Sequence, residues 1–266
     1  MDDDAPADQA LTYSSYLALD DVLGAQHPRS DEHDELLFIV VHQVYELWFK
    51  QLIHELGYLQ RMLDEGNEAR ASATFKRLLT ILKLVVAQLD VIETMTPVQF
   101  LAFRERLESA SGFQSGQFRE LEAILGRRDR GVLLAYHEGS VDRGRVQAAM
   151  ARPSVYDSFL RYLAAQGYEI PQDVLERDVT QPVAESEGVQ AALLQVYKDD
   201  AAPALLAERL VDFDEGFMEW RYHHVKMVER TIGSRPGTGG SPGAAYLRET
   251  LHRPFFPDLW TIRADL

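Results

Sequence analysis

Residues 33–50 read HDELLFIVVHQVYELWFK, and the spacing of the apolar side chains in this stretch decides the fold. Four of its residues recur at intervals of four, three and four: Phe38, His42, Tyr45 and Phe49. That spacing places them on one face of an α-helix. We expect the helix to begin between Ser30 and Glu35, with Ser30 as its N-cap, and to continue to about residue 64.

Helical periodicity continues along the rest of the chain, and no convincing strand pattern interrupts it. A second long helix is expected over residues 69–95, ended by Thr96-Pro97, and a third over residues 203–232. Shorter helices are expected over residues 98–108, 114–126, 142–150, 153–166, 189–199 and 244–251. The sequence therefore predicts one all-α domain over residues 1–266, a helical bundle built on three long helices.

Composition excludes several classes of function. The chain carries 27 Lys and Arg against 42 Asp and Glu, a net charge of -15 that disfavours binding to nucleic acid or anionic membranes. It has no cysteine, so disulfides, thiolate-bound zinc, iron–sulfur clusters and thiolate-ligated haem are impossible. Residues 1–10 do not resemble a signal peptide, and the apolar runs are short, so we expect a cytoplasmic protein with no membrane-spanning segment.

The last long helix contains a histidine within an apolar seam. The seam consists of Leu210, Phe213, Phe217, Trp220, His224, Met227 and Thr231, at alternating spacings of three and four. A lone histidine at such a position is more often a hydrogen-bonded core residue than a ligand. The functional alternative is specific, because a neutral imidazole in an apolar helical bundle can hold haem iron.

His42 presents the same two alternatives on the first long helix, where it shares its stripe with aromatic residues. It is either a satisfied core histidine or part of an apolar ligand pocket. Residues 42–46 read HQVYE and lack the HExxH pattern of zinc proteases, which argues against that class. His54 and Glu55 lie on another face, which we expect to be solvated.

Two further features allow ligand binding without requiring it. Arg104 follows Phe100 and Phe103, so its guanidinium either lies at the surface or, if buried, suits a substrate carboxylate. The glycine-rich stretch 235–243 follows no strand and lacks the Lys-Ser/Thr ending of a phosphate-binding loop. Its glycines permit close approach to a ligand, closure as a lid, or simple mobility.

Taken together, several motifs resemble the tryptophan 2,3-dioxygenase family. The motifs are LTYSSYL (11–17), HDELLFIVVHQVYELWFK (33–50), ETMTP (93–97) followed by Phe103-Arg104, SGFQS (111–115), WRYHH (220–224) and GTGG (237–240). They occur in the family's order and extend over nearly the whole chain. This resemblance implies a helical, homotetrameric haem b enzyme that uses O2 to cleave the indole ring of L-tryptophan, giving N-formylkynurenine.

The resemblance also implies residue roles. His224 corresponds to the proximal iron ligand and His42 to the distal histidine near the indole N–H. Arg104 corresponds to the partner of the substrate carboxylate, and Thr238 to a residue that holds the amino-acid end. The remaining expected substrate-site residues are Phe38, Phe100, Ser111 and Gly112, with Tyr13, Tyr16 and Leu17 from an N-terminal arm (residues 1–30) that reaches a neighbouring subunit.

The sequence also departs from the family's pattern. Phe100 stands where some members carry Tyr, and Pro242 replaces the usual second Ser of the glycine-rich segment. These departures keep open mono-oxygenation of a substituted tryptophan, such as β-methyltryptophan. Two other hypotheses are a non-catalytic haem-binding protein and a haem-free structural bundle.

Overall fold

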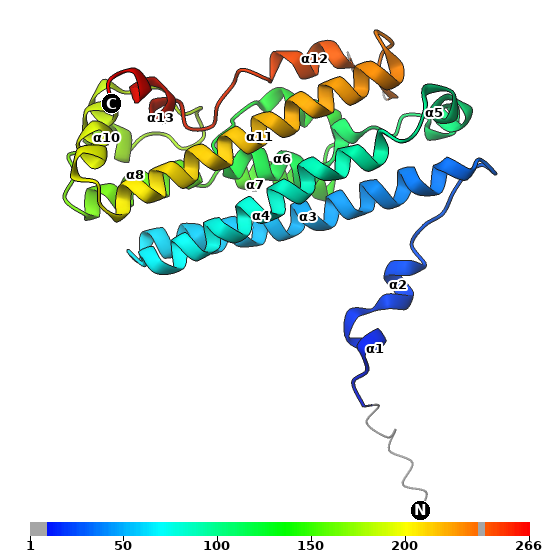
Figure 1. Cartoon of the computed structure of the whole chain (residues 1–266), viewed down its shortest axis with the longest axis horizontal. Helices are drawn as coiled ribbons and strands as arrows, with labels where there is room; N and C mark the ends of the chain where they lie inside the picture. The colour runs from blue at the N-terminus through cyan, green and yellow to red at the C-terminus, as the bar shows by residue number, and fades with distance from the viewer. Residues whose placement is uncertain (1–9, 239–242) are drawn as a thin grey trace, which may run out of the picture.

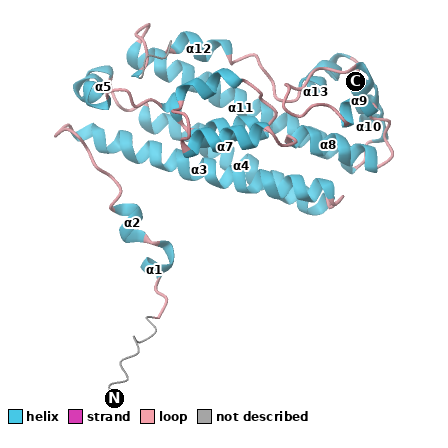
Figure 2. Ribbon diagram, turned by 180° about the vertical axis from the view of Figure 1, so that it is seen from behind, coloured by secondary structure: helices cyan, strands magenta, loops and turns pink. Residues whose placement is uncertain are grey.

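The computed structural model describes residues 10–238 and 243–266, and these residues form helices and no strand (Figures 1 and 2). The α-helices are α1 (Tyr13–Leu17), α2 (Leu19–Leu23), α3 (His33–Asp64), α4 (Glu68–Ile92), α5 (Pro97–Arg104), α6 (Gly116–Ile124), α7 (Val141–Met150), α8 (Val155–Ala165), α9 (Gln172–Leu175), α10 (Glu187–Asp199), α11 (Ala202–Ile232), α12 (Ala244–Glu249) and α13 (Pro257–Thr261). The predicted all-α class is confirmed.

Three long helices form the frame, as the periodicity predicts. α4 packs against both α3 and α11, and α6 and α8 pack against α3. The apolar seam of α11 faces the core, because Leu210, Phe213 and Phe217 are each at most 2% exposed. Burial of these large apolar side chains supplies most of the free energy that holds the helices together.

The start of α3 differs from the prediction. Ser30 is not the N-cap, because Glu32 occupies that position and α3 begins at His33. The buried carboxylate of Glu35 instead accepts hydrogen bonds from the backbone N–H groups of Arg29 and Ser30, at 2.8 Å each, and from the Ser30 hydroxyl. The carboxylate in the first turn therefore holds the preceding loop, while Ser30 donates to it.

The face containing Glu55 also differs. His54 is exposed as expected, but Glu55 is buried, with Arg77 of α4 donating to its carboxylate at 2.9 and 3.0 Å. A charged residue can occupy a helix–helix interface when a partner compensates its charge. Position on one helix does not reveal that partner.

The end of the bundle opposite α5 is closed by α8, α9, α10 and α13 (Figure 2). Buried Asp214 of α11 holds the C-terminal tail, accepting hydrogen bonds from the backbone N–H groups of Phe255 and Phe256 and from Trp260 Nε1. This attachment fixes the tail along α11, so that the segment from residue 250 onward covers the bundle.

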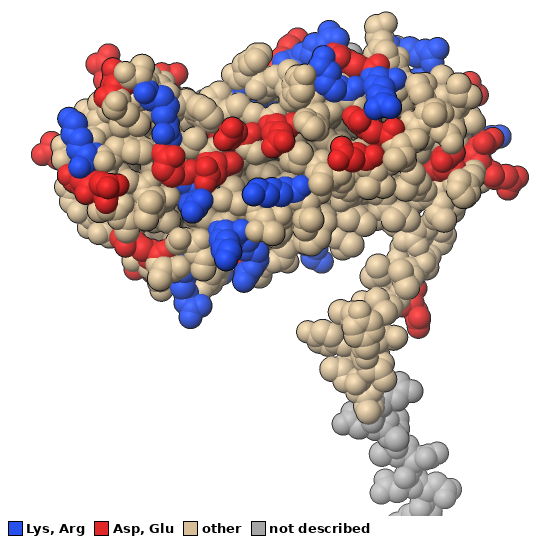
Figure 3. Space-filling model, in the orientation of Figure 1, with Lys and Arg blue, Asp and Glu red and all other residues tan. Residues whose placement is uncertain are grey.

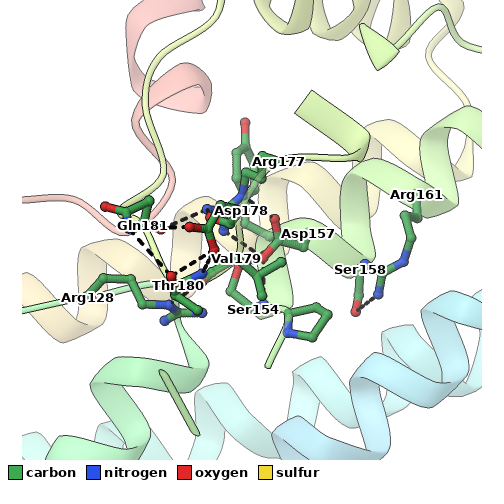
Figure 4. Close-up of polar contacts among 12 residues, drawn as sticks. Arg128, Ser154, Asp157, Ser158, Arg161, Arg177, Asp178, Val179, Thr180 and Gln181 are labelled. Atoms are coloured by element: carbon green, nitrogen blue, oxygen red, sulfur yellow. Dashed lines mark hydrogen bonds and ion pairs between the residues drawn. The ribbon is translucent and has the colours of Figure 1, made fainter. Parts of the chain in front are cut away.

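A polar clamp anchors the loop after α9 (Figure 4). The Arg177 guanidinium donates to both carboxylate oxygens of Asp157 on α8, at 2.7 and 2.8 Å. Arg128 donates to the backbone carbonyls of Val179 and Arg152, at 2.7 and 2.9 Å. Side-chain contacts to neighbouring segments therefore hold this loop in place.

Among the described residues, α3 is the one helix that is long and apolar enough to cross a membrane by length and composition alone. Core helices of soluble proteins pass the same test. One face of α3 packs on the bundle, yet only 22% of its most apolar 18-residue stretch is buried within this chain. Exposed apolar side chains on α3 and α4 include Leu36, Val40, Leu47, Leu84 and Val91.

The N-terminal segment leaves the bundle. α1 and α2 contact each other, and Figure 1 shows them projecting away from the long helices. Tyr13, Tyr16 and Leu17 are 76%, 71% and 40% exposed. Sequence periodicity did not predict these two helices, because five-residue helices without buried residues have no apolar face to detect.

Candidate functional site

A single cavity of about 280 Å³ brings together the chemistry-bearing residues of α3, α5 and α11. Eight of the eleven residues expected to form the site line it: Phe38, His42, Phe100, Arg104, Ser111, Gly112, His224 and Thr238. The walls are mainly apolar and aromatic, a lining typical of sites that enclose a flat organic ligand. Tyr13, Tyr16 and Leu17 do not line it within this chain.

His42 lies one turn after Phe38 on α3, and its orientation is fixed by the backbone. Nδ1 lies 2.7 Å from the Phe38 carbonyl oxygen, which can only accept, so Nδ1 carries the proton. Burial lowers the pKa of His42 and outweighs the opposing effects of the Phe38 carbonyl and Glu46. The ring is therefore neutral, and Nε2 is left as a hydrogen-bond acceptor.

His224 faces the same cavity from α11. Its ring stacks on Trp220 with centroids 5.0 Å apart and planes 8° apart. Burial lowers its pKa to about 4, and the nearby His42 adds to this effect, so the ring is neutral at pH 7. A neutral imidazole has the free lone pair that a metal ligand needs. Trp220 Nε1 is buried without a hydrogen-bond partner among the described residues.

Aromatic rings from α3 and α5 enclose the space beside His42. The Phe38 ring lies 4.1 Å from the His42 ring, 5.8 Å from Phe100 and 5.6 Å from Phe103, measured between centroids. The rings are tilted or edge-on to one another, as aromatic pairs prefer. Phe100 and Phe103 both lie on α5, which Thr96 caps by accepting from the Gln99 N–H.

Arg104 ends α5 and places a cation at the rim of this aromatic group. It is partly buried, and its Nη2 donates to the Pro236 carbonyl at 2.6 Å. The remaining N–H groups are available to a carboxylate ligand. The contact also holds the start of the glycine-rich segment; residues 239–242 of that segment lie outside the described residues.

Ser111, Gly112 and Thr238 occupy other parts of the cavity wall. The Ser111 side chain caps the short turn Gly112–Gln114 by accepting from the Phe113 N–H at 3.3 Å. A Cβ atom added at Gly112 would meet nothing within 4 Å. The packing around Gly112 therefore gives no reason for glycine at that position.

The cavity also contains charged residues that sequence reasoning missed. Arg119 and Glu122 of α6 and Arg221 of α11 line it, and all three are buried. Burial raises the pKa of Glu122, but the combined effect of Arg119, Arg221 and Arg127 is larger and brings this pKa below its usual value, so the carboxyl stays ionised. Charged residues at these positions are typical of any surface helix, and nothing in the sequence marks Arg119, Glu122 and Arg221 as buried.

An all-helical protein whose apolar cavity receives a neutral imidazole from each of two long helices has the donor set of a haem-binding site. Nitrogen donors suit iron, and the aromatic walls suit a flat macrocycle. The residues present therefore fit a haem group. This defines the class of protein, and comparison with known proteins defines the family.

The family model for tryptophan 2,3-dioxygenase matches residues 3–141 and 191–266. A tryptophan 2,3-dioxygenase of Anaeromyxobacter sp. (strain K) is 63% identical over 266 residues, covering 100% of both chains. One from Herpetosiphon aurantiacus is 57% identical over 260 residues, covering 97% of this chain and 99% of its own. One from Caulobacter vibrioides is 43% identical over 261 residues, with the same coverage.

The chain therefore belongs to the tryptophan 2,3-dioxygenase family. The family model leaves residues 142–190 unmatched, a stretch that contains α8, α9 and the Asp157–Arg177 clamp. The full-length match to the Anaeromyxobacter protein includes that stretch, so this segment is shared with at least some relatives. The cavity residues all lie in the parts that the family model matches.

Proposed function

We propose that this enzyme inserts both atoms of O2 across the C2–C3 bond of the indole ring of L-tryptophan, giving N-formylkynurenine. Family membership supports this reaction. The observation that carries it is the single cavity in which His224, His42, Arg104 and the Phe38 aromatic wall meet. One cavity thus offers an iron ligand, an acceptor for an N–H group, a cation and an apolar surface.

His224 would hold the iron of haem b through its free imidazole nitrogen. Bound ferrous haem supplies the binding and activation of O2. Trp220 stacks against the His224 ring and limits its rotation. The remaining work of the protein is to position tryptophan and to exclude water.

The substrate would be held at both ends. Arg104 would bind the carboxylate, with Thr238 and Ser111 close to the amino-acid end. Phe38 and Phe100 would pack against the indole ring, where burial of aromatic surface favours binding. His42 Nε2 is unprotonated and would accept a hydrogen bond from the indole N–H, which orients the ring in its plane.

We also propose a homotetramer of single-domain chains in which residues 1–30 form an arm that contacts a neighbouring subunit. Exposed apolar side chains on the arm, with those on α3 and α4, support this arrangement, because apolar surface that one chain leaves exposed can be buried against a neighbouring subunit. Figure 3 shows that the described part of the arm carries little charge. Tyr13, Tyr16 and Leu17 would then complete a cavity that this chain leaves open.

The absence of cysteine and the acidic composition suit a cytoplasmic location.

The mass of the product tests this proposal. The haem-loaded, reduced protein is supplied with L-tryptophan under ¹⁸O2, and the product is analysed by mass spectrometry. We expect a gain of two labelled oxygen atoms and a formamide group. A gain of one oxygen atom would instead identify a mono-oxygenase, and no oxygen uptake would identify a binding protein.

A further inference from the structure

A buried ion cluster lies between α6 and α11 at the cavity wall. The Arg119 Nη1 atom is 2.7 Å from Glu122 Oε2, while Arg221 Nη2 is 3.3 Å from Oε1 of the same carboxylate. Arg127 Nε lies 3.9 Å from Oε1. The residues Arg119, Glu122 and Arg221 are at most 7% exposed. Three guanidinium groups therefore share one carboxylate in a region that water scarcely reaches.

The positive charge of this cluster is incompletely compensated. Arg221 also donates hydrogen bonds to the backbone carbonyls of Thr250 and Arg253, at 3.3 and 3.1 Å. Asp214 is also near Arg221, but its hydrogen bonds go to the C-terminal tail and it does not line the cavity. Even with Asp214 ionised, the cluster keeps at least one positive charge without a counter-charge, a costly arrangement unless an anion binds.

Arg119 is the member of the cluster with an unused donor. Its Nε atom is buried and has no hydrogen-bond partner among residues 10–238 and 243–266. The guanidinium is held in place by Glu122 and by the Phe113 ring, whose centroid lies 4.5 Å from it. Arg119 lines the cavity. A fixed, desolvated N–H group of this kind gains more from an anionic acceptor than an exposed one does.

The cavity must receive two kinds of carboxylate if the proposed function is correct. One belongs to the amino-acid substrate, for which Arg104 lies at the end of α5, toward one end of the bundle (Figure 1). The other kind is the pair of propionates on haem b. Arg119 comes instead from α6, which Figure 1 shows behind the middle of α11 and away from α5.

We infer that Arg119 binds one propionate carboxylate of haem b through its guanidinium group, and that Glu122 is a positioning residue that holds this guanidinium in place. This inference rests on the proposed function, because it requires haem in the cavity. Arg119 then anchors the cofactor, and Arg104 remains free for the substrate.

The test combines one substitution with one change in the cofactor. The affinities of the wild type and of Arg119→Gln are measured for haem b and for haem b dimethyl ester, from the Soret change and from transfer to apomyoglobin. We expect Arg119→Gln to weaken binding of haem b by roughly ten- to hundredfold, the value of a charge-assisted hydrogen bond. The affinity for the uncharged diester should change by less than about threefold.

Matched controls separate this contact from a general loss of structure. Glu122 keeps Arg221 and Arg127 in the variant, so no buried charge is left without a partner. Arg263→Gln removes another Arg–Glu pair, with Glu208, away from the cavity, and should leave both affinities unchanged. Arg119→Lys keeps the positive charge. It should therefore bind haem b more tightly than Arg119→Gln does, with no such gain for the dimethyl ester.

Equal losses for haem b and its diester in Arg119→Gln would overturn the inference, since they would indicate a purely structural role. An unchanged affinity for both would overturn it as well. If circular dichroism shows that Arg119→Gln does not fold, the comparison of the two cofactors in Arg119→Lys decides in the same way. Failure of the wild type to bind haem b would instead refute the proposed function.

Discussion

Replacing Arg104 by Ala removes the cation that we propose for the carboxylate of tryptophan. The guanidinium uses one N–H for the Pro236 carbonyl, at 2.6 Å, which leaves others for the ligand. A hydrogen bond to a charged group contributes about 1.5–3 kcal/mol. Because Arg104 is only partly buried, solvent screening limits the total, and we expect a loss of about 2–3 kcal/mol. That loss raises the Kd for L-tryptophan roughly 30- to 150-fold.

The assay is a spectral titration of the ferrous, haem-loaded protein with L-tryptophan in the absence of oxygen. Tryptamine, which lacks the carboxylate, is titrated in parallel and should bind the wild type and Arg104→Ala with similar affinity. Arg106→Ala is the matched control, because Arg106 is exposed two residues further on and does not line the cavity. An equal loss for tryptamine, or unchanged binding of L-tryptophan, would refute the assignment.

Three further predictions follow from single contacts. His42→Ala should retain a full haem complement but lower kcat for oxygen consumption; loss of haem would contradict a role on the substrate side. Tyr45→Phe removes the 2.9 Å hydrogen bond to the Val85 carbonyl and should cost about 1 kcal/mol in urea unfolding, with no cost if that bond is dispensable. Burial raises the pKa of Asp157, but the combined effect of Arg177 and Ser154 is larger and brings this pKa below its usual value. The ionised Asp157 carboxylate stabilises the fold at neutral pH, and this stabilisation is lost as the pH falls below about 4. Asp157→Asn should therefore lower the free energy of unfolding by about 1–3 kcal/mol at pH 7 and by progressively less in acid. A difference that does not depend on pH would contradict this.

The frame of the fold could be predicted because long helices repeat their apolar pattern many times. The expected helix over residues 69–95 is α4 at Glu68–Ile92, and the one over 203–232 is α11 at Ala202–Ile232. Short elements such as α9 have too few residues for a period, and their position depends on contacts with distant segments. The expected Ser30 cap was wrong because the Ser30 hydroxyl donates to the Glu35 carboxylate and α3 begins three residues later, at His33.

The cavity could be predicted only in part. His224 stood out because an imidazole is unusual within an apolar seam, and His42 because it shares a stripe with aromatic rings. Neither pattern alone decided between a core residue and a ligand; the motifs that resemble a known family did. Arg119 gave no signal, because its burial depends on Glu122 and on Arg221 of a helix distant in sequence.

The proposed function depends most directly on His224 as the iron ligand, and the Soret spectrum of the haem-loaded protein tests this role. His224→Ala should lose stable haem binding, whereas His223→Ala, which changes the neighbouring residue outside the cavity wall, should keep a full haem complement and an unchanged spectrum. Added imidazole should restore the Soret band of His224→Ala. A His224→Ala protein that binds haem fully, with the spectrum of the wild type, would contradict the account.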